Sequence, residues 1–157
     1  MGVKPAVRKV QSAIRQLGIE REVIELGVDA RTSQQAADAL GVGVGQIAKS
    51  LVFTVNSSPL LVIASGANRV DELKLEKLAG GTVRRADPET VKQATGYAIG
   101  GVPPLGHPAP LPVYVDADLL QYELIYAAAG VPECVFPLTP AELVQGTGGR
   151  VADVKAE

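Results

Sequence analysis

The sequence has no tryptophan and only one histidine, one cysteine and one methionine, with four tyrosines and two phenylalanines. A single cysteine, Cys134, excludes an intramolecular disulfide and any cysteine-based metal site, and we expect it to be a buried small hydrophobe. So few aromatic side chains argue against a stacking platform for single-stranded nucleic acid. The formal net charge of −2 also argues against a broad basic face. We therefore expect no DNA partner, and any nucleic acid would be contacted over a small area.

Long apolar runs are also missing, and no segment approaches the ~20 residues that span a bilayer. The N-terminal stretch MGVKPAVRKVQSAIRQLG lacks the apolar region of a signal peptide, so we expect a cytoplasmic protein with no membrane partner. One histidine and one cysteine leave only carboxylates to complete a zinc site. The GVGVGQ stretch lacks the Lys-Ser/Thr ending of a phosphate-binding loop, and no serine lies in a GxSxG turn. The sequence thus implies no metal and no cofactor.

Hydrophobic periodicity and capping residues predict short helices alternating with strands. Helices are expected from residue 7 to 17 and within TSQQAADALG, VDELKLEKLAGG, ADPETVKQATG and LTPAELVQG. Strands are expected at 21–26, 48–55, 60–65, 82–86, 111–116, 123–129, 133–138 and 150–154, with a hairpin turn at NSSP. The strands after residue 110 follow one another too closely for βαβ crossovers, which favours antiparallel pairing there. We predict one α+β domain over residues 1–157, built on a mixed, mostly antiparallel sheet of about seven strands.

Residues 96–107, GYAIGGVPPLGH, hold four of the seventeen glycines, two of the eleven prolines and the single histidine. Glycine lets the backbone approach a ligand closely, so Gly100, Gly101 and Val102 could offer N–H groups to an oxygen atom. Pro103 and Pro104 donate nothing and would form a wall. A rigid connector between two strands is the simpler interpretation of the same residues.

Two charged residues stand beside apolar strands. Lys49 lies at the mouth of the apolar run in GQIAKSLVF, where it could bind an anion or simply protect a sheet edge. Asp116 closes LPVYVD, where it could act in a site or cap the following DADLL turn. Ser50, Ser65 and Asn68 lie nearby as further site candidates.

In combination these segments resemble the YbaK family of aminoacyl-tRNA editing domains, which also occur as the insertion domain of bacterial prolyl-tRNA synthetases. TSQQAADALGVGVGQIAKSLVF is similar to the family's first block, with its lysine at Lys49. The stretch from ASGANRVDELKL to GYAIGGVPPLGH, followed by LPVYVD, is similar to its second block, with the GxxxP loop at Gly100–Pro104. The resemblance covers about residues 20–153. It implies a YbaK-like fold and hydrolysis of the ester that joins a wrong amino acid to the 3′-terminal ribose of a tRNA.

The resemblance also implies roles for the candidate residues. The Gly100–Gly101 backbone would border the ester carbonyl and the attacking water and stabilise developing negative charge. Lys49 would hold the terminal phosphate or ribose oxygens. Asp116 would pair with Lys49 or with the substrate ammonium. No general base is evident, so a neighbouring hydroxyl of the substrate would assist.

Several points stay open at this stage. His107 has the intrinsic pKa of a general base, but it could equally line a pocket or stabilise the loop. Arg84, Arg85, Lys74 and Lys77 could contact the acceptor stem or form solvated surfaces. The expected substrates are small amino acids such as Ala, Cys or Ser, on tRNA(Pro), edited in trans, with a prolyl-tRNA synthetase as a possible partner. The alternative function is a binding module that captures aminoacyl-tRNA 3′ ends or aminoacyl-like ligands without turnover.

Overall fold

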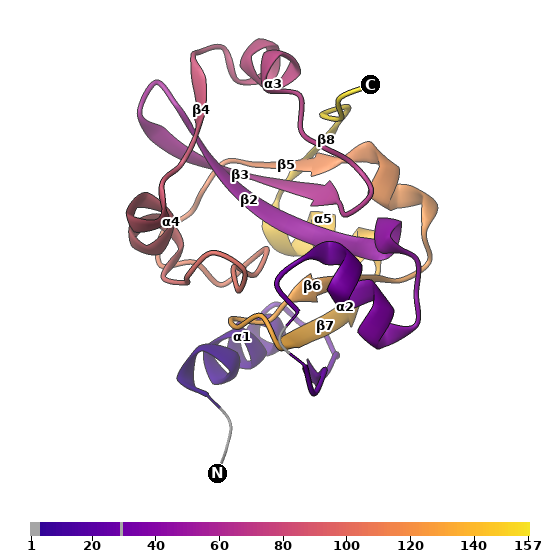
Figure 1. Ribbon diagram of the computed structural model, residues 1–157. Helices are drawn as coiled ribbons and strands as arrows, with labels where there is room; N and C mark the ends of the chain where they lie inside the picture. The colour runs from indigo at the N-terminus through magenta and orange to yellow at the C-terminus, as the bar shows by residue number, and fades with distance from the viewer. Residues whose placement is uncertain (1–3, 29) are drawn as a thin grey trace.

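The computed structural model describes residues 4–28 and 30–157. Five α-helices and eight strands make up this part of the chain (Figure 1). The helices are α1 (Pro5–Gln16), α2 (Ser33–Leu40), α3 (Glu72–Ala79), α4 (Pro88–Thr95) and α5 (Pro140–Thr147), with two 3₁₀ turns, η1 (Val44–Gln46) and η2 (Ala117–Gln121). The strands are β1 (Ile24–Glu25), β2 (Ile47–Val55), β3 (Ser58–Ser65), β4 (Val83–Arg85), β5 (Val113–Asp116), β6 (Ile125–Ala128), β7 (Cys134–Leu138) and β8 (Arg150–Ala152).

The helix starts follow the capping residues predicted from the sequence. Thr32 and Gln35 form a reciprocal capping box at α2, and Thr139 and Glu142 form one at α5. The Asp87 carboxylate accepts a bond from the third helical N–H of α4. These local interactions explain why short helices of eight residues form at the expected places.

The strands form one mixed sheet in the order β1-β7-β6-β2-β3-β5-β8, and β4 pairs with β2 beside that path. Its centre is the long β2–β3 hairpin (Figure 1). The hairpin turns at Asn56 and Ser57, both with positive φ, as a two-residue type I′ turn requires. The predicted α+β class and the mixed, mostly antiparallel sheet are confirmed, with eight strands rather than about seven.

The expected antiparallel pairing after residue 110 is confirmed for β6 with β7 but is wrong for β5. The reason is the η2 turn, which carries the chain away from β5 directly after Asp116. β5 is instead flanked by β3 and β8, both parallel to it. The strand expected at 21–26 is also shorter, since only Ile24 and Glu25 pair with β7.

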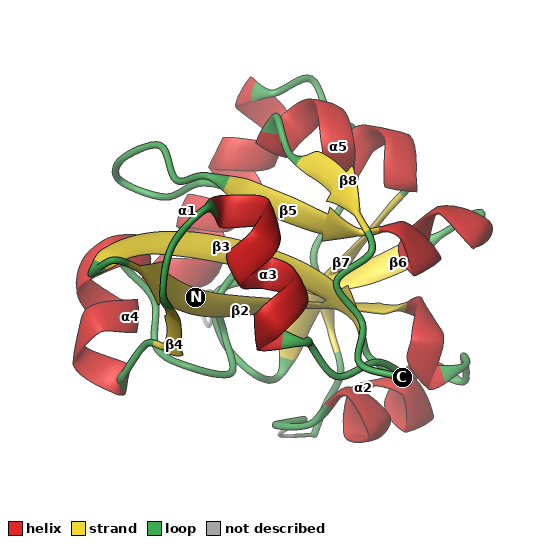
Figure 2. Cartoon of the chain, turned by 90° about the horizontal axis from the view of Figure 1, so that it is seen from above, coloured by secondary structure: helices red, strands yellow, loops and turns green. Residues whose placement is uncertain are grey.

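Helices cover both faces of the sheet (Figure 2). One face packs against α1, α4 and α5 through a large core that includes Val10, Val91 and Leu143. The other face packs against α3 through Leu75 and against α2 through Ala37. Cys134 is buried, as expected. Within the described ranges, the helices are all too short or too polar to span a bilayer.

Candidate active site

In the part of the chain that the structure describes, the middle of β2 pairs with a strand on one side only, and we call its other side the open edge. One side of β2 pairs with β3 along the whole hairpin. The other side pairs with β6 only at Ile47 and Ala48, and with β4 only at Phe53–Val55. Among the residues that the structure describes, the backbone between these two short pairings, residues 49–52, therefore has a strand on one side only.

A cavity of about 330 Å³ opens at this edge. It is bounded by the start of α2, the middle of β2, the end of β4, the loop before β5, and the β6–β7 connection. The polar or charged side chains that line it belong to Arg31, Thr32, Ser33, Lys49, Ser50, Arg85 and Tyr126. Its apolar lining includes Val52, Val91, Ile99, Val102 and Val135, together with the backbone of Gly100. None of the described lining residues carries a carboxylate, an imidazole or a thiol.

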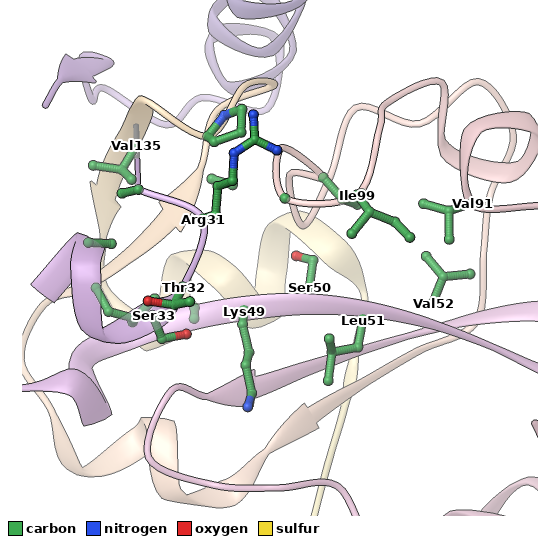
Figure 3. A pocket seen from close by; sticks show the side chains of 18 of the residues that line it. Arg31, Thr32, Ser33, Lys49, Ser50, Leu51, Val52, Val91, Ile99 and Val135 are labelled. Carbon is green, nitrogen blue, oxygen red and sulfur yellow. The ribbon is translucent and has the colours of Figure 1, made fainter. Parts of the chain in front are cut away.

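Lys49 and Ser50 point to opposite sides of β2, because successive side chains alternate along a strand. In Figure 3 the Lys49 side chain extends away from Ser50, while Ser50 points to the side that holds Ile99 and Val52. Both residues line the cavity, so the cavity wraps around the open edge of the strand. This separates a lysine side from a serine side.

The lysine side is cationic. Burial, together with the positive charges of Arg85 and Arg69, lowers the pKa of Lys49, while the negative charge of Asp116 acts in the opposite direction. Arg85 also lies over the Phe53 ring, with its guanidinium carbon 5.6 Å from the ring centre. Within the described chain, Lys49 has no ion pair, so its charge is available to an anionic ligand.

The serine side is small and mostly apolar. The Ser50 hydroxyl is buried and has no hydrogen-bond partner among the described residues. Val52 and Val91 also line the cavity and are buried, whereas Ile99 is 55% exposed. A buried hydroxyl without a partner is costly, which points to a ligand that completes its hydrogen bonding.

The loop before β5 approaches the cavity through a tight turn. The Gly101 N–H donates to the Ala98 carbonyl at 3.0 Å, and Gly100 has a φ of +95°, as the third position of a type II turn requires. The Gly101 carbonyl accepts from the Gly130 N–H at 2.9 Å. A Cβ on Gly101 would lie 2.5 Å from the Gly130 carbonyl oxygen, so this position requires glycine.

These contacts divide the predicted loop residues into two groups. Gly100 and Val102 line the cavity. Gly101, Pro103 and Pro104 are buried behind them and do not line it. The Gly101 N–H is occupied within the turn, so donation to a substrate oxygen stays a prediction for Gly100 and Val102 alone.

His107 stabilises the loop from behind. Its Nε2 donates to the Pro103 carbonyl at 2.9 Å, which fixes the Nε2–H form of the neutral ring. Burial lowers the pKa of His107, and Lys9 adds to this effect. The imidazole lines a second cavity with Pro104, Leu105 and Gly106 rather than the cavity at β2. The interpretation of His107 as a loop residue therefore fits its contacts.

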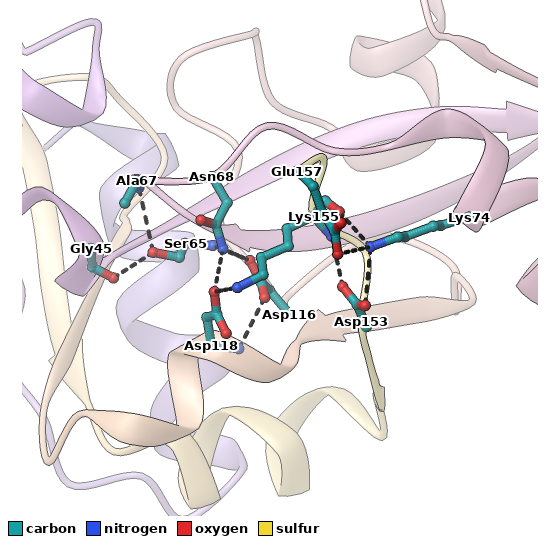
Figure 4. Close-up of polar contacts among 10 residues, drawn as sticks. All are labelled: Gly45, Ser65, Ala67, Asn68, Lys74, Asp116, Asp118, Asp153, Lys155 and Glu157. Atoms are coloured by element: carbon teal, nitrogen blue, oxygen red, sulfur yellow. Dashed lines mark hydrogen bonds and ion pairs between the residues drawn. The ribbon is translucent and has the colours of Figure 1, made fainter.

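Asp116 is the centre of a buried polar network (Figure 4). Only 1% of it is exposed, and its carboxylate accepts from the Ser65 N–H at 3.0 Å, the Asn68 amide at 2.9 Å and the Asp118 N–H at 3.0 Å. The last bond caps η2, so the helix-cap interpretation is confirmed. The Ser65 hydroxyl donates to the Gly45 carbonyl at 2.8 Å. Asp116, Ser65 and Asn68 thus fix the loop after β3 and do not line the cavity.

The other predicted basic residues are scattered. Arg85 lines the cavity, and Arg84 is exposed beside it on β4. Lys74, in the first turn of α3, donates to the Asp153 carboxylate and to the Lys155 carbonyl. Lys77 is exposed on the same helix. Sequence reasoning missed Arg31 and Ile99, because both become site residues only through loops that meet at β2.

Comparison with known proteins identifies the family. A family model described as an aminoacyl-tRNA editing domain matches residues 28–145. The chain belongs to this family. The match includes Lys49, the Gly100–Pro104 loop and Asp116, so the resemblance noted from these motifs is confirmed.

The most informative relatives are one solved structure and two curated proteins. One crystal structure, described as that of a proposed trans-editing enzyme for prolyl-tRNA synthetase, is 47% identical, with a TM-score of 0.95 over 99% of this chain and 100% of that chain. EbsC of Enterococcus faecalis, named as a proposed Cys-tRNA(Pro)/Cys-tRNA(Cys) deacylase, is 29% identical over 80% of this chain and 78% of its own. The uncharacterized Bacillus subtilis protein YwhH is 31% identical over 93% and 94% of the two chains. Matches also fall within proline–tRNA ligases, as in Shouchella clausii, where the match covers only 18% of the ligase.

Proposed function

We propose that this protein is a trans-acting deacylase that hydrolyses the ester of mischarged aminoacyl-tRNA. The observation that carries the proposal is the cavity at the open edge of β2. It joins a cationic side at Lys49 and Arg85 to a small apolar side at Ser50, with the Gly100 turn at its border. The 3′ end of an aminoacyl-tRNA has the matching parts, namely a phosphate and ribose on one side of an ester and a small acyl group on the other.

Lys49 places the substrate in this scheme. Its unpaired ammonium binds the phosphate or ribose oxygens of the terminal nucleotide as a point charge, and Arg85 and Arg84 extend the positive surface toward the acceptor stem. Fixing the ester against the loop lowers the entropic part of the barrier. A protein of net charge −2 needs only this local contact to bind a protruding 3′ end.

The reaction is attack of water on the ester carbonyl. Negative charge develops on the carbonyl oxygen, and the N–H groups of Gly100 and Val102 are the nearest main-chain candidates to stabilise it. One such donor contributes about 10²–10³ in rate. Because the described lining offers no carboxylate, imidazole or thiol as a base, the free ribose hydroxyl next to the ester relays the proton: its oxygen accepts a proton from the attacking water while its own proton passes to the ribose oxygen that leaves. When the ester breaks, the ribose oxygen leaves with a proton and the amino acid is released.

The proposed substrates are Ala, Cys or Ser on tRNA(Pro), whose short side chains would lie against the mostly apolar lining formed by Val52, Val91 and Ile99. The relatives described for prolyl-tRNA synthetase and for Cys-tRNA(Pro) support the same choice. Such a substrate is formed in the cytoplasm, where a prolyl-tRNA synthetase would be the functional partner. The domain would act on the ester after the synthetase releases it.

A panel of charged tRNAs tests the proposal. tRNA(Pro) carrying labelled alanine, cysteine, serine or proline is incubated with the protein, and release of the label is followed against spontaneous hydrolysis. We expect release of one or more of the small amino acids and sparing of proline. Equal rates with and without protein for every ester would refute the deacylase.

The second candidate is a binding module for aminoacyl-tRNA 3′ ends. The lack of a carboxylate, an imidazole or a thiol in the described cavity lining favours it. A module of this kind would bind the charged tRNA and slow the spontaneous loss of the amino acid. The same panel distinguishes it, because protection and release change the rate in opposite directions.

A further inference from the structure

Ser50 presents its main chain, as well as its hydroxyl, to the cavity. Val55 and Ser58 close the two-residue hairpin as a hydrogen-bonded pair, and the Gly66 N–H donates to the Ile47 carbonyl at 2.7 Å. In an antiparallel ladder such pairs alternate, so Ile47, Lys49 and Leu51 direct their backbone groups to β3. The N–H and the C=O of Ser50 therefore point away from β3, to the open edge.

Neighbouring segments stop short of this position on both sides. The β2–β6 pairing ends at Ala48 with Ala127, and the Gly130 N–H donates to the Gly101 carbonyl instead of continuing the ladder. On the other side, the Ala86 N–H donates to the Val52 carbonyl at 3.1 Å. Ser50 thus lies between the last residue of β2 that pairs with β6, Ala48, and the residue bonded to Ala86, Val52. The Ser50 hydroxyl also has no hydrogen-bond partner among the described residues. A buried hydroxyl of this kind is costly unless a ligand satisfies it.

The carbonyl and hydroxyl oxygens of Ser50 are acceptors, so the matching ligand group is a donor. We propose that the α-amino group of the aminoacyl ester docks on Ser50, where the main-chain carbonyl and the hydroxyl oxygen accept its hydrogens. The proposal rests on the proposed function and defines its substrate class more narrowly: esters of amino acids with a free α-amino group, as opposed to 2-hydroxy acids or N-acylated amino acids.

Of the three cations that line the cavity, Lys49 and Arg85 agree with this placement, whereas Arg31 lies on the side of Ser50 (Figure 3). Lys49 points to the other side of the strand from Ser50 (Figure 3), and Arg85 acts on Lys49 there. The backbone of β2 therefore lies between these cations and the proposed amino group. An ammonium on the lysine side would be repelled by both charges, whereas two neutral oxygen acceptors are available at Ser50.

The test compares amino and hydroxy esters of the same size. The probe is whichever ester of the panel is cleaved, paired with its 2-hydroxy analogue on the same tRNA: lactyl for alanyl, or glyceryl for seryl. Each rate is divided by the spontaneous hydrolysis rate of that ester, because the ammonium also activates the ester chemically. We expect the enhancement to be at least about tenfold larger for the amino ester, since hydrogen bonds to charged groups are worth about 1.5–3 kcal/mol.

Variants assign the effect to Ser50. In Ser50→Ala the ratio between amino and hydroxy esters should fall at least about threefold, whereas Ser58→Ala, an exposed serine of the same hairpin, should keep the wild-type ratio. A wild-type ratio near one, or a ratio unchanged in Ser50→Ala, would overturn the proposal while leaving the deacylase intact. If no amino ester is cleaved at all, the proposed function fails, and this inference fails with it.

Discussion

Replacing Lys49 by methionine removes the charge that the account places on the substrate phosphate, while keeping most of the side-chain volume. Two unit charges about 4 Å apart interact by about 4 kcal/mol at an effective dielectric constant of 20. Lys49 is only partly buried, and water screens part of this energy. A net loss of about 1.5–3 kcal/mol is therefore expected, which corresponds to about a 10- to 150-fold lower kcat/KM.

The same substitution should leave the thermal stability of the protein unchanged or raise it slightly. Lys49 has no ion pair within the described chain, and burial, Arg85 and Arg69 all disfavour its charged form. The Lys49→Met protein should therefore melt at the same temperature as the wild type or slightly higher. A catalytic defect caused by unfolding would show the reverse.

The pH dependence gives a second readout of the same residue. The pKa of Lys49 lies below its ordinary value, so the ammonium loses its proton, and its hold on the phosphate, earlier than a free lysine would. In wild type, kcat/KM should fall as the pH rises through this lowered pKa. In Lys49→Met that alkaline fall should be absent.

The assay is single-turnover deacylation of a labelled aminoacyl-tRNA, corrected for spontaneous hydrolysis, with melting temperatures measured in parallel. Lys92→Met, an exposed lysine on α4, is the matched control and should keep wild-type kinetics. Wild-type kcat/KM in Lys49→Met would refute the reasoning. So would a loss of activity explained entirely by a lower melting temperature.

Four further predictions follow from the described contacts. Gly101→Ala forces a Cβ to within 2.5 Å of the Gly130 carbonyl oxygen, so thermal melts should show that the folded state loses about 1–3 kcal/mol of stability. A Cβ at Gly100 contacts Pro132 at 3.5 Å, and Gly100→Ala should cost about 1–2 kcal/mol of stability because of the positive φ at that position. Equal, negligible losses in the two variants would refute the close packing at Gly101. His107→Gln can still donate to the Pro103 carbonyl, so the pH–rate profile from pH 5.5 to 8 should keep its shape. Burial lowers the pKa of His107 in the folded state below its value in the unfolded chain. The wild type should therefore lose stability as the pH falls below about 6.5. Melting temperatures measured over this pH range should fall less in His107→Gln. Asp116→Asn places an amide donor against donors from Ser65, Asn68 or Asp118 and should cost about 1–3 kcal/mol in chemical denaturation; an unchanged midpoint would contradict the network. Arg85→Gln should weaken tRNA binding and lower the slope of log K against log salt by about one, and an unchanged slope would remove Arg85 from the interface.

Local elements of the fold were predictable because their signals are local. Thr32 with Gln35, and Asp87 before Pro88, mark helix starts through hydrogen bonds that span three residues. The β2–β3 hairpin follows from two apolar strands around a polar turn. The parallel partners of β5 were not predictable in this way, because they come from β3 and β8, which are distant in sequence.

In the candidate site, too, the residues marked by local motifs were predictable, and the features that depend on contacts distant in sequence were not. Lys49 and the Gly100 turn were found through motifs, and the structure brings both to one cavity. Asp116 and Ser65 looked like site residues because they lie beside the same motifs, but their bonds join the end of β3 to the end of β5 and to the η1 turn. The open edge at Ser50 depends on where β6 and β4 stop pairing with β2, and no short stretch of sequence carries that information.

The central claim is that the cavity turns over an aminoacyl ester rather than merely holding it. The most direct measurement is release of labelled amino acid from mischarged tRNA(Pro) with the charged tRNA in large excess over protein, while binding is followed on the same samples. A catalytic cavity should release many moles of amino acid per mole of protein, at a rate well above spontaneous hydrolysis. Binding of the charged tRNA with no release above the spontaneous rate would contradict it and make the protein a binding module.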